Sequence, residues 1–194
     1  MARSSTVWTI GHSNHDLAQV VGLLAGERIE FVADVRSFPY SRFVPQFNRD
    51  ELKQGLRNAG LDYLFLGEEL GGRPARPEHY DSEGHALYGK MAEEPNFQQA
   101  VQRLVEGASA HRIALLCSEG SPQECHRRLL VGRVLAEKGV VLRHILPSGE
   151  VIEEERVSVE GDNSQPALFD DDLPVWRSTQ SVSQKRRLST SSAA

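Results

Sequence analysis

The chain has few cysteines, no long apolar run and no excess of positive charge. Its 194 residues include only Cys117 and Cys125, too few for a secreted disulfide framework, so we expect a cytoplasmic protein. No apolar stretch is long enough to span a bilayer, and the first residues lack the apolar core of a signal peptide, so we expect no membrane partner. The net charge of −5 disfavours nucleic-acid binding through bulk charge, but is compatible with a local basic groove.

The usual phosphate-binding and metal-binding motifs are also missing. The Gly71-Gly72 pair fits neither the Walker pattern nor the dinucleotide fingerprint. A Cys-x5-Arg phosphatase loop at Cys117 is excluded because Gln123 stands where the arginine would be. Cys117, Cys125 and His126 lack a standard zinc spacing, so no metal is predicted. These patterns leave the cofactor open.

Strand-like apolar segments alternate with amphipathic helical segments along most of the chain. The predicted strands are 6–10, 31–35, 63–66, 113–117 and a closing pair at 140–145 and 151–155. This alternation predicts a single α/β domain with a mainly parallel sheet and helices on both faces. We place this domain at residues 1–158. From there the composition changes to Ser, Asp, Gln and Pro without periodicity, which predicts a disordered tail over 159–194.

Local signals predict where the helices begin. Ser13 with Asp16 resembles a capping box, with Asn14 as an alternative cap. The segment 121–124, Ser-Pro-Gln-Glu, predicts the start of a helix that runs to Lys138. Residues 67–95 are rich in Gly and Pro, which predicts a long loop or lid.

Polar residues follow three of the predicted strands, where the ligands of open α/β sheets bind. Helix N-termini and arginines favour an anion, so phosphate or carboxylate is the expected ligand. The candidate ligand-binding residues are Arg36, Arg42, Arg127, Ser13 and Cys117. The candidate acids, bases and nucleophiles are Cys125, His126, His12, Asp34 and Glu119.

Several of these residues also have a purely structural interpretation. Cys117 ends an apolar strand and is as easily a buried, inert thiol. Asp34 can neutralise Arg36 or Arg127 as a structural ion pair, and His12 can be a core histidine. Cys125 is either a nucleophile with a pKa lowered by the helix dipole or a small buried helix residue.

An ordered set of motifs resembles one prokaryotic family. The set comprises Gly11-His12-Ser13, Asp34-Val35-Arg36-Ser37-Phe38-Pro39 with Ser41 and Phe47, Tyr63, Leu66-Gly67, Leu70-Gly71-Gly72, Leu116-Cys117-Ser118-Glu119, Pro122, Cys125-His126-Arg127 and His144-Ile145. Over residues 6–155 it resembles the family known as domain of unknown function 488. The resemblance implies an α/β fold with these polar positions in one pocket, and it implies no reaction.

The predicted tail contains a short peptide of a different kind. Gln165-Pro166-Ala167-Leu168-Phe169 looks like the bacterial peptide that docks on the replicative sliding clamp. In such a peptide Leu168 and Phe169 would enter an apolar groove, and Gln165 would fix the register by hydrogen bonds. An ordinary acidic linker is the alternative.

Three hypotheses follow from the sequence. The first is a DNA-maintenance accessory whose pocket binds a nucleotide or a nucleic-acid phosphate. The second is a small-molecule enzyme with thiol chemistry at Cys117 or Cys125. The third is a module that binds a phosphorylated metabolite without turnover.

Overall fold

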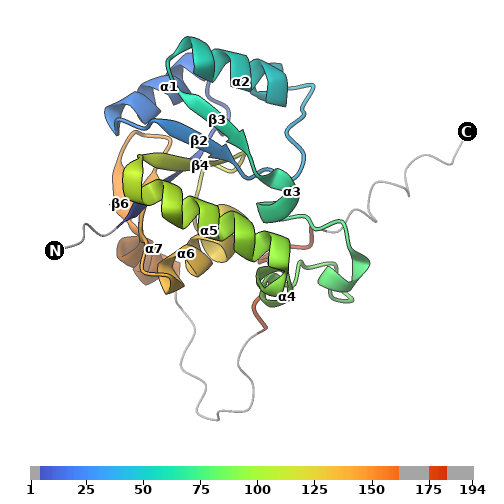
Figure 1. The fold of residues 1–194 in the computed structure, drawn as a ribbon. Helices are drawn as coiled ribbons and strands as arrows, with labels where there is room; N and C mark the ends of the chain where they lie inside the picture. The colour runs from blue at the N-terminus through green and yellow to red at the C-terminus, as the bar shows by residue number, and fades with distance from the viewer. Residues whose placement is uncertain (1–4, 162–174, 183–194) are drawn as a thin grey trace, which may run out of the picture.

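A computed structural model describes residues 5–161 and 175–182, which include a six-stranded sheet between two layers of helices (Figure 1). The strands are β1 (Thr6–Gly11), β2 (Phe31–Asp34), β3 (Asp62–Phe65), β4 (Ile113–Cys117), β5 (Val141–Ile145) and β6 (Val151–Glu153). Their order is β3-β2-β4-β1-β5-β6, and all neighbours pair in parallel except the antiparallel β5–β6 edge. The predicted α/β class with a mainly parallel sheet is confirmed.

Helices cover both faces of the sheet, as predicted. The longer ones are α1 (Leu17–Gly26), α2 (Arg49–Asn58), α5 (Pro95–Ala110) and α7 (Glu154–Gly161); the shorter ones are α3 (Gly67–Leu70), α4 (Tyr88–Glu93) and α6 (Arg133–Glu137), with 3-10 turns at Pro45–Phe47 and Pro77–His79. A π-helical segment, Arg127–Gly132, leads directly into α6. Figure 1 shows α1 and α2 on one face of the sheet and α5 and α6 on the other. In the part of the chain that is described, no helix combines the length and apolarity needed to cross a membrane.

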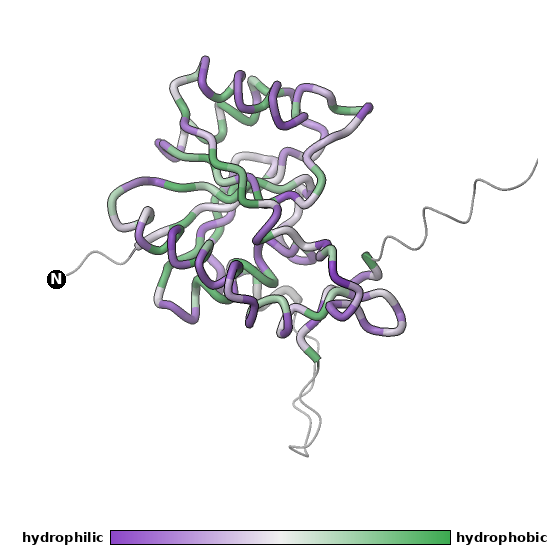
Figure 2. Tube along the Cα trace, turned by 45° about the vertical axis from the view of Figure 1, so that its right-hand side comes forward, coloured by the Kyte–Doolittle hydropathy of each residue, from purple (hydrophilic) through white to green (hydrophobic). Residues whose placement is uncertain are grey.

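The core has two halves because the side chains of each strand alternate between the faces. Trp8 and Ile10 of β1 pack with α1 and α2, whereas Val7 packs with α5 and α6. Hydrophobic residues accordingly lie mainly in the central strands, and the outward turns of the helices are hydrophilic (Figure 2).

The strand order places a topological switch point at the centre of the sheet. From β1 the chain passes through α1 to β2 and through α2 to β3, and both steps move toward the β3 edge of the sheet. It then returns to place β4 between β2 and β1, and α6 leads onward to β5 on the other side. The loops after β4 and after its neighbours therefore leave toward opposite faces, and the crevice between them is where α/β sheets bind ligands.

Two predicted helix starts are wrong. The cap of α1 is Asp16, which accepts a hydrogen bond from the Gln19 amide while the Gln19 side chain accepts one from the Asp16 amide. Ser13 instead adopts a left-handed φ of 49°. The helix predicted from Ser121 begins only at His126 and Arg127, since residues 121–125 form turns. In this segment the Gln123 amide donates to Ser121 Oγ, and the Cys125 amide donates to the Pro122 carbonyl.

Residues 67–95 are not the structureless loop that the sequence predicted. They contain α3, the turn Pro77–His79 and α4. Leu70, Tyr88 and Met91 from this stretch are buried in the core. Residues 67–95 are therefore part of the folded domain and contribute to its core.

Residues 175–182, within the predicted tail, pack against the domain. The Trp176 indole N–H donates to the Leu129 carbonyl at 2.8 Å, and the Arg133 guanidinium lies 4.3 Å from the centre of a Trp176 ring. Ser178 is buried, and its amide donates to the Ala86 carbonyl. These residues belong to the folded unit. The clamp-like peptide 165–169 lies outside the described residues.

Candidate functional site

A buried ion pair closes the carboxyl end of β2. Arg36 donates from Nε and Nη2 to the two Asp34 carboxylate oxygens, at 2.8 Å and 2.6 Å. The Tyr63 hydroxyl donates to the same carboxylate at 2.8 Å, and burial raises the pKa of Tyr63, which keeps that proton in place. Asp34 is completely buried, and its carboxylate accepts hydrogen bonds from Arg36 and Tyr63. This is the structural-pair interpretation of Asp34.

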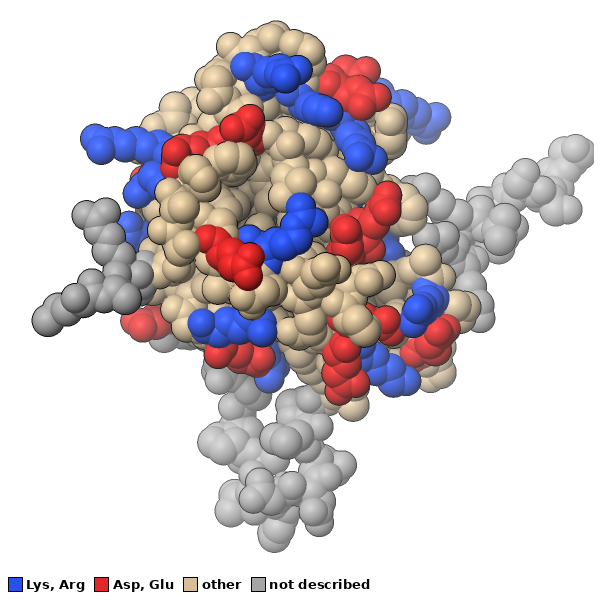
Figure 3. Space-filling view, in the orientation of Figure 1, with Lys and Arg blue, Asp and Glu red and all other residues tan. Residues whose placement is uncertain are grey.

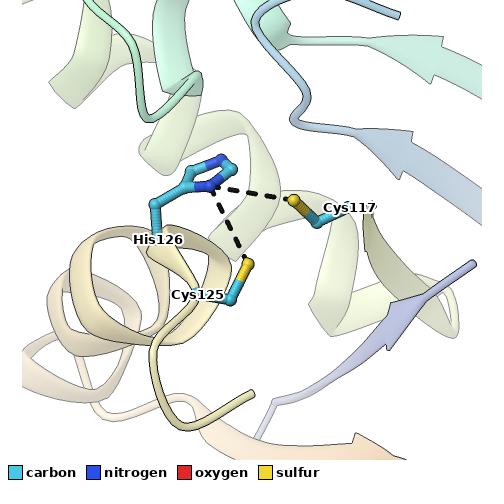
Figure 4. A group of neighbouring side chains, drawn as sticks. All are labelled: Cys117, Cys125 and His126. Carbon is cyan, nitrogen blue, oxygen red and sulfur yellow. Dashed lines mark hydrogen bonds between the residues drawn. The ribbon is translucent and has the colours of Figure 1, made fainter. Parts of the chain in front are cut away.

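Both cysteines and one histidine meet at the carboxyl end of β4. Cys117 ends the strand, while Cys125 and His126 lie at the start of the following helix (Figure 4). The Nδ1 atom of His126 lies 3.8 Å from Cys117 Sγ and 3.9 Å from Cys125 Sγ. Its Nε2 atom lies 2.8 Å from the Val35 carbonyl, which can only accept, so Nε2 carries a proton. Nδ1 is therefore the basic atom facing the two thiols.

This arrangement separates the pKa values of the two thiols. The Cys125 thiol donates a hydrogen bond to Cys117, and with the His126 charge it holds the pKa of Cys117 well below the usual value. The same hydrogen bond and burial raise the pKa of Cys125 well above it. Burial by itself lowers the pKa of His126, but the Cys117 charge, its hydrogen bond and the Val35 carbonyl outweigh burial and raise that pKa. The lowered pKa of Cys117 favours its thiolate, and the raised pKa of His126 favours its imidazolium.

Glycines allow the close packing around this cluster. A β-carbon on Gly72 would lie 2.6 Å from the His126 ring, and one on Gly71 would lie 2.3 Å from Ser37 Oγ. A β-carbon on Gly11 would lie 1.6 Å from the Glu119 carbonyl oxygen. Gly72 thus allows the backbone to pass directly against the His126 ring, and Gly71 allows it to pass against Ser37.

The three side chains are also suited to a soft divalent cation. Their ligand atoms all lie within 4.8 Å of one another, and donor atoms in a tetrahedral zinc site lie about 3.6 Å apart. A ligating histidine usually donates its other N–H to a carbonyl, as His126 does to Val35. Cys117, Cys125 and His126 could therefore hold zinc, although they lack a standard spacing in the sequence. The absence of a metal stays a prediction.

A pocket of about 640 Å³ opens beside the cluster. It is lined by Arg36, Ser37, Phe38, Tyr40, Gly72, Arg73, Tyr88, Cys117, Ser118, Glu119, Ser121, Gln123, Glu124, Cys125, His126 and residues 178–182. Of the predicted site residues, Arg36, Cys117, Glu119, Cys125 and His126 therefore share one cavity, and Asp34 supports Arg36.

Four other predicted residues do not line this pocket. Arg127 is completely buried and donates to the carbonyls of Glu119 and Gly120, so it holds the loop after β4. The His12 ring stacks on Phe47 at 4.2 Å. Burial lowers the pKa of His12, which favours a neutral histidine inside the fold. The remaining two are Ser13 and Arg42.

The sequence did not single out Arg73, Tyr88 or residues 178–182 as pocket residues. Arg73 follows the Gly71-Gly72 pair, and its amide donates to Ser37 Oγ, which brings it beside Arg36. Its proximity to those glycines was the only available signal. Residues 178–182 carry no such signal in the sequence, because they reach the pocket only through tertiary packing.

Comparisons with known proteins agree with this picture at the level of the family. A sequence model described as Domain of unknown function DUF488 matches residues 16–134. No curated protein and no solved structure matches the chain. The matched range contains β2, β4, both cysteines and His126.

Proposed function

The chain belongs to the DUF488 family, a description that carries no activity, and from its own geometry we propose an enzyme with Cys117 as a nucleophile. The proposal rests on one observation, the contact between Cys117 Sγ and the basic Nδ1 of His126 at the base of a pocket. A thiolate beside an imidazolium is the reactive form of a cysteine.

The proposed reaction is a group transfer through Cys117. His126 Nδ1 takes the Cys117 proton, and the thiolate then forms a bond to an electrophilic carbon or phosphorus of the substrate. The bond to the leaving group breaks with its electron pair, and the leaving group takes the proton back from His126. In the second half, a water molecule gives a proton to His126 Nδ1 and bonds to the same carbon or phosphorus, while the bond to Cys117 Sγ breaks with its electron pair and restores the thiolate. The Cys125 thiol donates to Cys117 Sγ and stays protonated.

The substrate is proposed to carry an anionic group. Arg36 and Arg73 line the pocket near one another, and Arg36 is held in place by Asp34. Guanidinium groups bind carboxylate and phosphate oxygens well. Glu119 and Glu124 line another part of the same pocket, so the anion is expected at the arginines. A nucleotide or nucleic-acid phosphate is one substrate that fits, as the DNA-maintenance hypothesis requires.

Alkylation by iodoacetamide tests the proposed nucleophile. The lowered pKa of Cys117 keeps it a thiolate below the usual thiol value of 9.0. Labelling at Cys117 is therefore expected to persist below pH 9, where an ordinary thiol becomes mostly protonated, and to decline as the pH falls through the lowered pKa. Cys125, whose pKa is raised, should remain nearly unlabelled over this range. Peptide mass spectrometry assigns the label, with Cys117→Ser and Cys125→Ser as matched controls.

Measurement of bound metal provides the opposing outcome. If the purified protein carries one equivalent of zinc, and Cys117 is labelled only after chelation, the cluster is a metal centre and the nucleophile proposal is wrong. Preferential labelling of Cys125 would contradict it equally.

Gly72→Ala is expected to weaken the reactive pair without unfolding the protein. The new methyl group would overlap the His126 ring, so the ring must shift, which disturbs its contacts with Cys117 and the Val35 carbonyl. We expect Cys117 labelling at pH 6 to slow about threefold, measured beside a thermal melt. Gly22→Ala is the control, because nothing lies within 4 Å of its added β-carbon. Unchanged labelling in Gly72→Ala would show that this glycine does not position the histidine.

A further inference from the structure

The loop between β2 and α2 exposes three aromatic side chains. Phe38, Tyr40 and Phe43 are 57%, 67% and 79% exposed, which places half of the large exposed hydrophobic side chains of the described residues on this loop. Such a cluster on a protein surface commonly marks a binding site.

The loop is held in a defined shape. The Ser41 amide donates to Asn48 Oδ1 at 2.7 Å, and the Phe43 amide donates to Ser41 Oγ at 3.1 Å. The Arg49 amide donates to the Pro39 carbonyl at 3.0 Å. The backbone thus fixes the aromatic side chains on the surface, where they form a prearranged platform.

Cationic side chains lie among these rings. The Arg42 guanidinium is 4.7 Å from the centre of the Phe43 ring, and Arg49 is 4.1 Å from that of Phe65. A hollow of about 460 Å³ beside the loop is lined by Tyr40, Arg49, Asp50, Lys53, Tyr63, Leu64 and Phe65. Residues 37–53 hold three cations and two carboxylates, in a chain whose net charge is −5. Figure 3 shows Lys and Arg side chains at the α2 end of the visible face, with Asp and Glu side chains beside them.

We propose that this surface, formed by the loop 37–48 and the start of α2, binds single-stranded nucleic acid. Bases would stack on Tyr40 and Phe43, and phosphates would contact Arg42, Arg49 and Lys53. Alternating aromatic and cationic groups are what single-strand binding surfaces offer. An acidic peptide would use the cations but would leave the ring faces without a partner.

The surface continues into the thiol pocket. Tyr40 lines both the hollow and the pocket, and Phe38 lines the pocket. A strand bound on the loop would therefore pass the mouth of the cavity that holds Cys117. The inference goes beyond the proposed thiol chemistry and does not depend on it, because it rests on the loop alone.

Fluorescence anisotropy with full-length protein tests the inference, using a labelled twelve-nucleotide oligo-dT and an abasic strand of equal length. Stacking predicts at least tenfold tighter binding of oligo-dT than of the abasic strand. The double variant Tyr40→Ser/Phe43→Ser should remove this preference. Three phosphate contacts predict a slope of about −2 for log affinity against log salt, and Arg42→Gln should make that slope shallower. The matched control is Val141→Ser, an exposed apolar residue on β5.

Three outcomes would overturn the inference. One is equal binding of the dT and abasic strands by the natural protein. The second is a preference that survives Tyr40→Ser/Phe43→Ser but disappears when Lys185, Arg186 and Arg187 become alanine, which would assign binding to the C-terminal residues. The third is displacement of oligo-dT by poly-glutamate of equal charge at the same concentration, which would indicate an acidic-peptide site. None of these outcomes depends on labelling at Cys117, so failure of this inference is distinguishable from failure of the thiol proposal.

Discussion

Replacement of Asp34 by alanine is expected to lower the free energy of unfolding by about 3–5 kcal/mol, the range for removing one partner of a buried ion pair. Asp34 is completely buried, and only 6% of the Arg36 side chain is exposed. Without the carboxylate, the Arg36 guanidinium and the Tyr63 hydroxyl lose an acceptor that water cannot easily replace. Urea denaturation followed by circular dichroism measures the change.

Tyr63→Phe is the matched control for this prediction. It removes one hydrogen bond to Asp34 and leaves the ion pair, so we expect a loss of only about 1 kcal/mol. If Asp34→Ala costs no more than Tyr63→Phe, the guanidinium reaches solvent when unpaired, and the pair does not anchor this end of β2. Arg36 would then lack the fixed position that the proposed anion site requires.

His126→Gln is expected to have the largest effect on thiol reactivity. A glutamine side-chain amide can still donate to the Val35 carbonyl, but it offers no basic atom in place of Nδ1. The pKa of Cys117 should rise, because the His126 charge and hydrogen bond no longer lower it, and the thiolate fraction below pH 9 should fall. Since a thiolate of higher pKa is intrinsically more nucleophilic, part of the loss is offset, and we expect labelling of Cys117 to slow by about tenfold.

The pH profile separates an electrostatic effect of His126 from a loss of structure. The variant should recover the natural rate as the pH approaches 9, because the thiolate then forms without help. A rate that stays low at pH 9 would indicate a blocked pocket, and an unchanged rate at pH 6 would exclude His126 as the base.

The sheet could be predicted from the sequence because its signal is local. Segments such as Ile113–Cys117 are continuously apolar and lie between polar turns, which is typical of strands buried on both faces. The helix after β4 was placed too early for the opposite reason. Arg127 lies at its true start and donates to the carbonyls of Glu119 and Gly120 from within the core, a contact that local capping residues do not encode.

The sequence predicts where in the sheet the site lies, but not which way its side chains point. The residues that follow β2 and β4 had to meet at one edge of a parallel sheet, and Arg36, Cys117 and His126 do so. Spacing along the chain could not show that His126 faces the pocket while its neighbour Arg127 points into the core. The role of Gly72 against the His126 ring was equally hidden, because it joins residues far apart in the sequence.

The segment 175–182 is a tethered ligand of its own domain. Residues 162–174 join it covalently to α7, so its hydrogen bonds to the Leu129 and Ala86 carbonyls form within one chain. One peptide-bond cleavage between 162 and 174 would turn this intramolecular contact into a bimolecular one. Dissociation of the released peptide would remove residues 178–182 from the lining of the Cys117 pocket.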